Sequence, residues 1–160
     1  MKPINSWRQV AQPVILAVAL LLAAFAATGS IFAAELETVV IDKSEGDDLS
    51  FEVEMARTPD ERSLGLMFRD ALDPMSGMLF IYPGPQEVNM WMHSTKIPLD
   101  MLFIGADGTI VKIKERAVPY SNEVIGSGAP VVAVLELNGG TASRLGIAPG
   151  DRVQLPEISE

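Results

Sequence analysis

The sequence contains no cysteine, a single histidine and few aromatic side chains, which make up 6% of its 160 residues. Without cysteine the chain forms neither disulfides nor cysteine-ligated zinc sites, and thiol chemistry is excluded. His93 alone supplies too few nitrogen ligands for a transition-metal site, and no Asp/Asn run has the spacing of a calcium loop. We therefore expect a domain that folds without a metal or a cofactor.

Acidic residues are also absent from the first 34 positions. The segment 1–13 carries two basic residues, an unbroken apolar run covers Val14–Ala27, and the next residues are mostly small. This order of cationic, apolar and small segments is typical of a secretory signal, so we predict a signal peptide over 1–33 and a periplasmic or secreted protein. The alternative is an uncleaved inner-membrane anchor over 14–34, because the run approaches the length of a membrane span when it is extended through Phe32.

The remaining residues, 35–157, are enough for one domain. After Ala34 the chain has 10 basic and 21 acidic side chains, a formal charge of −11. Nucleic acid and anionic membranes would repel such a surface. We therefore expect no nucleic-acid partner, and membrane contact only through the N-terminal segment.

The hydrophobic pattern predicts a mainly β (α+β) fold. Leu49–Met55 alternates like a half-buried strand, whereas Leu99–Ile104 and Val131–Leu137 are apolar at nearly every position, like strands covered on both faces. Further strands are expected at 35–42, 78–82, 109–113, 123–125 and 152–155. About eight short strands of this kind predict a single compact barrel-like or sandwich-like domain.

One or two short helices are expected beside these strands. Thr58, Pro59 and Glu61 supply an N-cap, a proline at N1 and a capping-box glutamate for a helix from Pro59 to about Met67. We expect Leu64, Met67 and Phe68 to face the core. A single helical turn is expected over 141–145, with Thr141 as its cap.

The stretch Asn89–Ile104 holds the chain's only histidine and the only tryptophan after the predicted signal. Alternation places Asn89, Trp91 and His93 on one face of its first half. Trp91 could form an aromatic wall for a flat ligand such as a sugar, or it could be a core residue, which the surrounding apolar strands favour. His93 could be a general base, but no partner carboxylate is evident, so a structural or surface role is favoured.

Asp100 and Glu136 each interrupt an apolar strand. If they converge, they would form a carboxylate pair of the kind used in acid–base catalysis or glycoside cleavage. Alternatively, each accepts hydrogen bonds from loop amides or from a cation such as Arg69 or Lys96 and so locks a turn. The second interpretation is favoured, because a buried carboxylate without a partner costs several kcal/mol.

Several short motifs occur along the chain in a fixed order. They are Gly65-Leu66-Met67 with Arg69, Gly77-Met78-Leu79-Phe80, Trp91-Met92 with Thr95, Ile97-Pro98-Leu99-Asp100 with Phe103, Leu135-Glu136-Leu137 with Gly139 or Gly140, and Gly150-Asp151. With these motifs the chain resembles the bacterial and archaeal domain-of-unknown-function 192 family over roughly Glu37–Leu155. The resemblance implies a compact β-rich fold, often exported, with no established activity and no catalytic residue to carry over. His93 and Ser94 replace the Lys and Asn usual in relatives, so a mechanism needing that lysine does not apply here.

The leading hypothesis is an exported, non-enzymatic module that binds a small or extended envelope ligand, or a partner, beside Trp91. Its candidate groove residues are Trp91, His93, Asp100, Arg69, Asn89 and Glu136, with none assigned to a metal. The alternative is a hydrolase or lyase acting on a carbohydrate or other envelope substrate through Asp100 and Glu136. An assembly factor recognised through its acidic surface is a third hypothesis. Neither the ligand nor the oligomeric state follows from the sequence.

Overall fold

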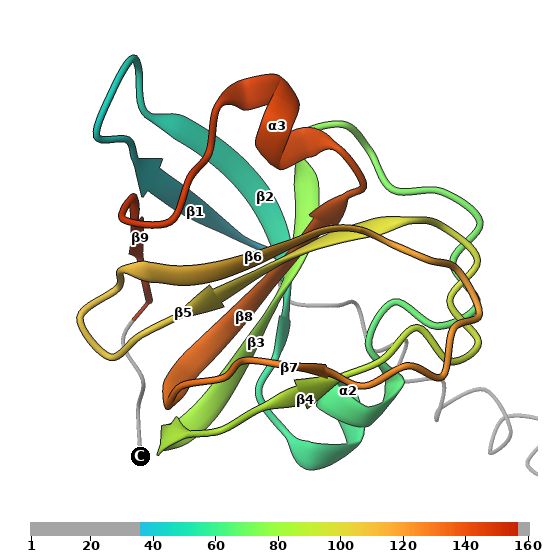
Figure 1. Ribbon diagram of the computed structural model, residues 1–160. Coiled ribbons are helices and arrows are strands. Elements are labelled where there is room, and N and C mark those ends of the chain that lie inside the picture. The colour runs from blue at the N-terminus through green and yellow to red at the C-terminus, as the bar shows by residue number, and fades with distance from the viewer. Residues whose placement is uncertain (1–35, 157–160) are drawn as a thin grey trace, which may run out of the picture. The chain divides into compact units, whose positions relative to one another are not determined.

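A seven-stranded sheet dominates residues 36–156, the part of the chain that this computed structural model describes (Figure 1). The predicted signal at 1–33 lies outside the described residues. The strands are β1 (Leu36–Asp42), β2 (Leu49–Ala56), β3 (Ser76–Gln86), β4 (Asn89–Met90), β5 (Leu99–Ile104), β6 (Ile110–Ala117), β7 (Ile125–Gly126), β8 (Val131–Asn138) and β9 (Arg152–Gln154). The large sheet has the order β6-β5-β8-β3-β2-β1-β9, and β4 pairs with β7 in a small second sheet.

The two strands predicted to be covered on both faces lie side by side within the large sheet. β5 is buried at every position and β8 at every position but its last. Side chains alternate between two apolar clusters along β5: Met101 and Phe103 belong to one cluster, and Leu102 and Ile104 to the other. The sheet therefore has a core on each face.

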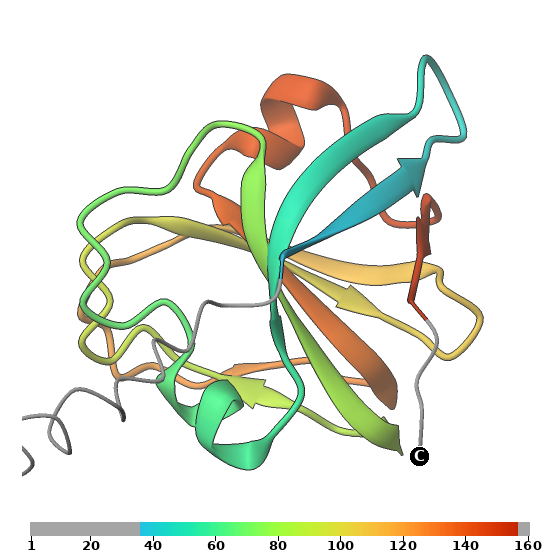
Figure 2. The same ribbon diagram turned by 180° about the vertical axis from the view of Figure 1, so that it is seen from behind.

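A short helix lies beside each of these cores. α3 (Thr141–Leu145) places Ala142 in the cluster that contains Leu102. The loop after α2 (Pro59–Leu64) places Leu66 in the opposite cluster. Both views show α2 and α3 on opposite sides of the sheet, with β4 and β7 on the side of α2 (Figures 1 and 2).

The N-terminus of α2 forms as predicted. The Thr58 side chain accepts a hydrogen bond from the Glu61 N–H, the Glu61 carboxylate accepts one from the Thr58 N–H, and Pro59 opens the helix. The predicted end was wrong, because the helix stops at Leu64, before Gly65 in a positive-φ conformation. Of the residues predicted to face the core, Leu64 and Phe68 are exposed and Met67 is half-buried, whereas Leu66 after the helix is buried.

The first half of the central stretch is less regular than alternation predicted. Only Asn89 and Met90 pair as a strand, and the chain then turns through Ser94, which has a positive φ. The predicted alternation still describes burial, since Met92 is fully buried while Trp91 and His93 are exposed. The other predicted strands form, but β3 and β6 each end four residues later than predicted, and β7 overlaps its predicted range only at Ile125.

The fold class is confirmed for residues 36–156: nine strands, mostly in one curled sheet like half a barrel, with two short helices. Apart from the parallel pair β2–β3, all strand pairs in both sheets are antiparallel. Among these residues no helix has both the length and the apolar character needed to cross a bilayer.

Candidate functional site

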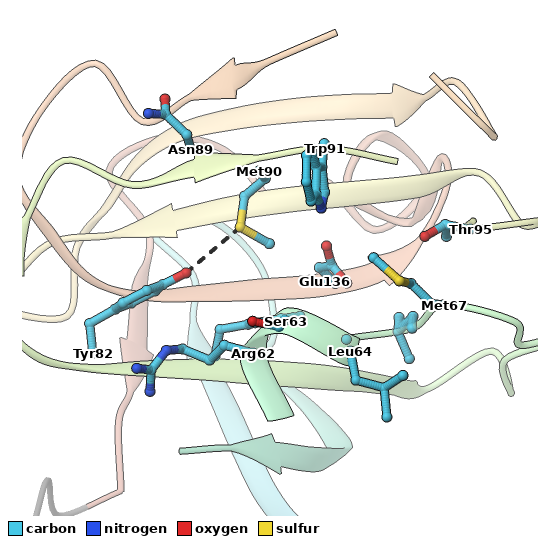
Figure 3. Close-up of a pocket in the computed structure, with 13 residues that line it drawn as sticks. Arg62, Ser63, Leu64, Met67, Tyr82, Asn89, Met90, Trp91, Thr95 and Glu136 are labelled. Atoms are coloured by element: carbon cyan, nitrogen blue, oxygen red, sulfur yellow. Dashed lines mark hydrogen bonds between the residues drawn. The ribbon is translucent and has the colours of Figure 1, made fainter. Parts of the chain in front are cut away.

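A pocket opens between α2 with its following loop, strand β3 and the segment around β4 (Figure 3). Its volume is about 430 Å³ including the open mouth. The lining residues are Arg62, Ser63, Leu64, Gly65, Leu66, Met67, Phe80, Tyr82, Asn89, Met90, Trp91, Thr95 and Glu136. The enclosed part of this volume is about 90 Å³, room for a small ligand group, and the lining contains both apolar and polar side chains.

Glu136 forms the buried polar end of this pocket. It lies on β8 opposite Met78 of β3 and Met101 of β5, on the sheet face that carries Phe80 and Phe103. Its side chain is 3% exposed, and burial raises its pKa to about 8. Glu136 is therefore mostly protonated at neutral pH.

No described residue forms a hydrogen bond or ion pair with the Glu136 carboxyl group. Every fully enclosed side-chain nitrogen or oxygen in residues 36–156 does have a hydrogen-bond partner. The Glu136 oxygens are thus not sealed within protein, and they contact the pocket that the residue lines. A buried acid in this state retains unused hydrogen-bonding capacity directed at a ligand space.

Asp100 is held in the opposite way. Its Oδ1 accepts hydrogen bonds from the N–H groups of Arg116 and Gly140, and its Oδ2 accepts one from the Ala142 N–H, each at 2.8 Å. The Asp100 carboxylate therefore accepts hydrogen bonds from the backbone N–H groups at the start of α3. Thr141 was predicted to be the cap of this helix, but Gly140 occupies the cap position and makes no side-chain hydrogen bond. The interpretation of Asp100 as a lock formed by loop amides is confirmed.

The carboxylate pair does not form. Met101 faces Glu136 across the β5–β8 register and Asp100 faces Leu137, so the two carboxyl groups point to opposite faces of the sheet. The proposed cationic partners are engaged elsewhere as well. Arg69 forms an ion pair with Glu54, and the Lys96 Nζ lies 2.6 Å from the Asp70 carboxylate.

Trp91 lies at the mouth of the pocket. Its side chain is 55% exposed, so the interpretation of this residue as a core tryptophan was wrong. In the close-up Trp91 stands above Glu136, and Asn89 also lines the pocket (Figure 3). His93 contacts Trp91 with ring centroids 5.7 Å apart, and its Nδ1 lies 3.1 Å from the Asn122 side-chain oxygen. His93 is exposed and not part of the lining, so it belongs to the surface beside the pocket.

Two further polar side chains of the lining come from β3 and α2. The Tyr82 hydroxyl donates to the Met90 sulfur at 3.7 Å, and burial raises the pKa of this phenol to about 12. The Arg62 guanidinium donates to the backbone oxygens of Arg57 and Ile81 and lies 5.1 Å from the centre of the Tyr82 ring. Tyr82 is thus neutral, and Arg62 is engaged by protein groups.

The loops at one edge of the pocket contain strained backbone. Phe68, Ser94 and Tyr120 have φ values of 64°, 55° and 60°, which are costly for residues other than glycine. The Phe68 N–H donates to the Ser94 carbonyl at 3.0 Å, and the Tyr120 N–H donates to the Thr95 carbonyl at 3.1 Å. These bonds hold the three strained residues around Thr95, a buried residue of the pocket lining. Strain of this kind concentrates at functional sites.

The structure thus brings together three of the six candidate groove residues: Trp91, Asn89 and Glu136. Sequence reasoning missed the contribution of α2 and of Tyr82. The period of two along β3 placed Tyr82 on the same face as Phe80, which was the available signal. Residues 36–156 contain no cluster of three or more His, Cys, Asp or Glu side chains that could hold a metal.

Comparison with known proteins gives a family and similar structures. The model of the domain-of-unknown-function 192 family, described as an uncharacterized ACR, matches residues 40–155. A Sinorhizobium meliloti 1021 protein provisionally described as a transcription regulator has 47% identity and a TM-score of 0.74, covering 76% of this chain and 94% of its own. A protein of unknown function from Novosphingobium aromaticivorans DSM 12444 has 40% identity and a TM-score of 0.75, with 81% and 91% covered. No curated protein matches the chain.

Proposed function

The chain belongs to the domain-of-unknown-function 192 family, and we propose that it is a non-enzymatic module that binds a small ligand in the pocket above Glu136. The observation that carries this proposal is the unpartnered carboxyl group of Glu136, 3% exposed and in contact with the pocket. A buried polar group without a partner destabilises a fold by about 1–3 kcal/mol. A hydrogen bond from a bound ligand would offset this cost.

The contrast with Asp100 supports the proposal. The same sheet satisfies Asp100 with three backbone amides, so the fold is able to provide partners for a carboxylate with a structural role. Glu136 has none, and an apolar side chain would fit between its neighbours Met78 and Met101. A structural role therefore explains Asp100 and leaves Glu136 unexplained.

Binding is favoured over catalysis because the hydrolase or lyase alternative needed two carboxyl groups facing one groove. Asp100 and Glu136 occupy opposite faces of the sheet. The exposed Trp91 ring at the mouth instead offers a flat apolar surface on which the body of a ligand can pack. Our proposal includes no nucleic-acid partner, because DNA or RNA would repel a chain with a formal charge of −9.

We also propose that this module works in the cell envelope, on the basis of the cationic, apolar and small segments within residues 1–34. Sequencing the N-terminus of the protein expressed in its own host tests this part. A mature chain beginning near Ala34 in the periplasmic fraction is the expected result. A chain that still begins at Met1 and is found in the membrane fraction would instead mean that the N-terminal segment is an uncleaved membrane anchor.

The binding proposal is tested with the full chain carrying Trp7→Phe, so that Trp91 is its only tryptophan. The probes are a small ammonium, a small carboxylate, a neutral alcohol and a methyl glycoside, each titrated while Trp91 emission is recorded. At least one probe should give a saturable change. The pocket variant Ser63→Tyr should weaken binding of that probe, whereas the matched variant Ser143→Tyr on α3, also exposed but outside the lining, should not. If no probe saturates, or if both variants act alike, the pocket is not a ligand site.

A further inference from the structure

The chemistry of the pocket also indicates which ligand it takes, an inference that rests on the binding function proposed above. Only three titratable side chains line the pocket: Arg62 of α2, Tyr82 of β3 and Glu136 of β8. Arg62 donates to two backbone oxygens and stacks on Tyr82. Tyr82 donates its proton to the Met90 sulfur. Glu136 is the one ionisable group of the lining without a protein partner.

The buried part of the lining offers acceptors rather than donors. The hydroxyl groups of Tyr82 and Thr95 already donate, to the Met90 sulfur and to the His93 carbonyl, and their oxygen lone pairs remain available. When ionised, the Glu136 carboxylate adds two more acceptor oxygens. A primary ammonium group carries three N–H donors and no acceptor, so it complements this set.

The walls of the pocket also suit a cation on an apolar stem. The π face of Trp91 attracts positive charge, and the thioethers of Met67 and Met90 are polarisable. Leu66 and Phe80 are buried residues of the lining against which an alkyl chain can pack. The net charge of −9 also disfavours the approach of an anionic ligand.

We propose that the pocket recognises a small primary amine, with the ligand ammonium paired to the ionised Glu136 carboxylate. Before binding, the carboxyl group is protonated because it is buried. On binding, Glu136 releases its proton to solvent, and the charge of the carboxylate is balanced by the ammonium that arrives. The desolvation cost of this buried pair is offset by the acceptor oxygens around it.

The test compares three probes of equal chain length: n-butylammonium, 1-butanol and butyrate. With five non-hydrogen atoms, butylammonium should bind with a Kd of about 1 mM. Its affinity should exceed that of both other probes by at least about tenfold, and it should rise about tenfold per pH unit from pH 6 to 7.5 and level off above pH 8. Calorimetry at pH 7 in buffers of different ionisation enthalpy should show about 0.9 proton released per ammonium bound.

The variant Glu136→Gln keeps the shape of the side chain and removes its ionisation. It should weaken butylammonium binding at least about tenfold and abolish proton release. If 1-butanol or butyrate binds the native protein as tightly as butylammonium, or if binding releases no proton, the amine assignment is wrong. In those cases the pocket remains a ligand site. The binding function itself would be overturned by the failure of every probe, the methyl glycoside included, or by equal effects of Ser63→Tyr and Ser143→Tyr.

Discussion

Replacing Glu136 by glutamine should make the free protein more stable at neutral and alkaline pH. The pKa of this carboxyl group rises from 4.5 in the unfolded chain to about 8 in the folded protein, because burial disfavours its charged form. Between these two values the unfolded chain releases the proton while the folded protein keeps it. Stability contributed by this group therefore falls as the pH rises, and the full cost is reached above pH 8.

The size of the effect follows from the pKa shift. One pKa unit corresponds to about 1.4 kcal/mol, so Glu136 costs the folded state about 3 kcal/mol at pH 7 and about 5 kcal/mol well above pH 8. A small domain is stable by about 5–15 kcal/mol in total, so this cost is a large fraction of the whole. The buried amide that replaces the carboxyl group in the variant has a cost of its own, but that cost does not vary with pH.

Denaturant unfolding of the native protein and the Glu136→Gln variant at pH 5 and pH 8 isolates the contribution of Glu136 ionisation to stability. The stability of the Glu136→Gln variant relative to the native protein should increase by about 3–4 kcal/mol between these two pH values. Glu52→Gln is the matched control, because it removes one carboxylate from an exposed position of the same sheet, and its relative stability should change far less. If the two variants show the same pH dependence, Glu136 is ionised in the folded protein, and our account of a protonated carboxyl group at the buried end of the pocket is incorrect.

Two further substitutions test the other parts of the central stretch. Asp100→Asn should destabilise the fold by about 1–3 kcal/mol at pH 7, since an acceptor of three backbone N–H groups is replaced by an amide with one oxygen. An unchanged denaturation midpoint would contradict the structural role of Asp100. Trp91→Ala should change stability by less than about 1 kcal/mol, because the side chain is 55% exposed. In the Trp7→Phe background, Trp91 emission should also be accessible to acrylamide, and a blue-shifted, quencher-resistant spectrum would place the ring in the core instead.

The sequence predicted the strands of this domain well because most of them repeat a simple pattern. Val131–Leu137 and Leu99–Ile104 are apolar throughout and became neighbouring buried strands, and the cap residues at Thr58 and Glu61 set the start of α2. The end of that helix was misplaced because Gly65 breaks it before a third turn. In the loop that follows, Leu66 is buried in the core and Phe68 is exposed.

The site was harder to predict because it depends on which strands become neighbours. Glu136 and Asp100 look alike in sequence, as single acids within apolar runs. The register Met101–Glu136 places them on opposite faces, and no local pattern fixes that register. The contribution of α2 to the pocket is equally non-local, since about 70 residues separate Arg62 from Glu136 along the chain.

The different surroundings of these two acids link the fold to its function. Around Asp100, the loop after β8 and the start of α3 are arranged so that each carboxylate oxygen receives at least one N–H group, and the charge becomes part of the framework. Around Glu136, β3 and β5 offer only the apolar side chains of Met78 and Met101, and the polar groups that do come near belong to a pocket open to solvent. A residue that costs the empty protein several kcal/mol while facing a ligand-sized space is best explained by an interaction made only when that space is filled. The same reasoning extends to the strained residues Phe68, Ser94 and Tyr120, because they surround Thr95 of the pocket lining.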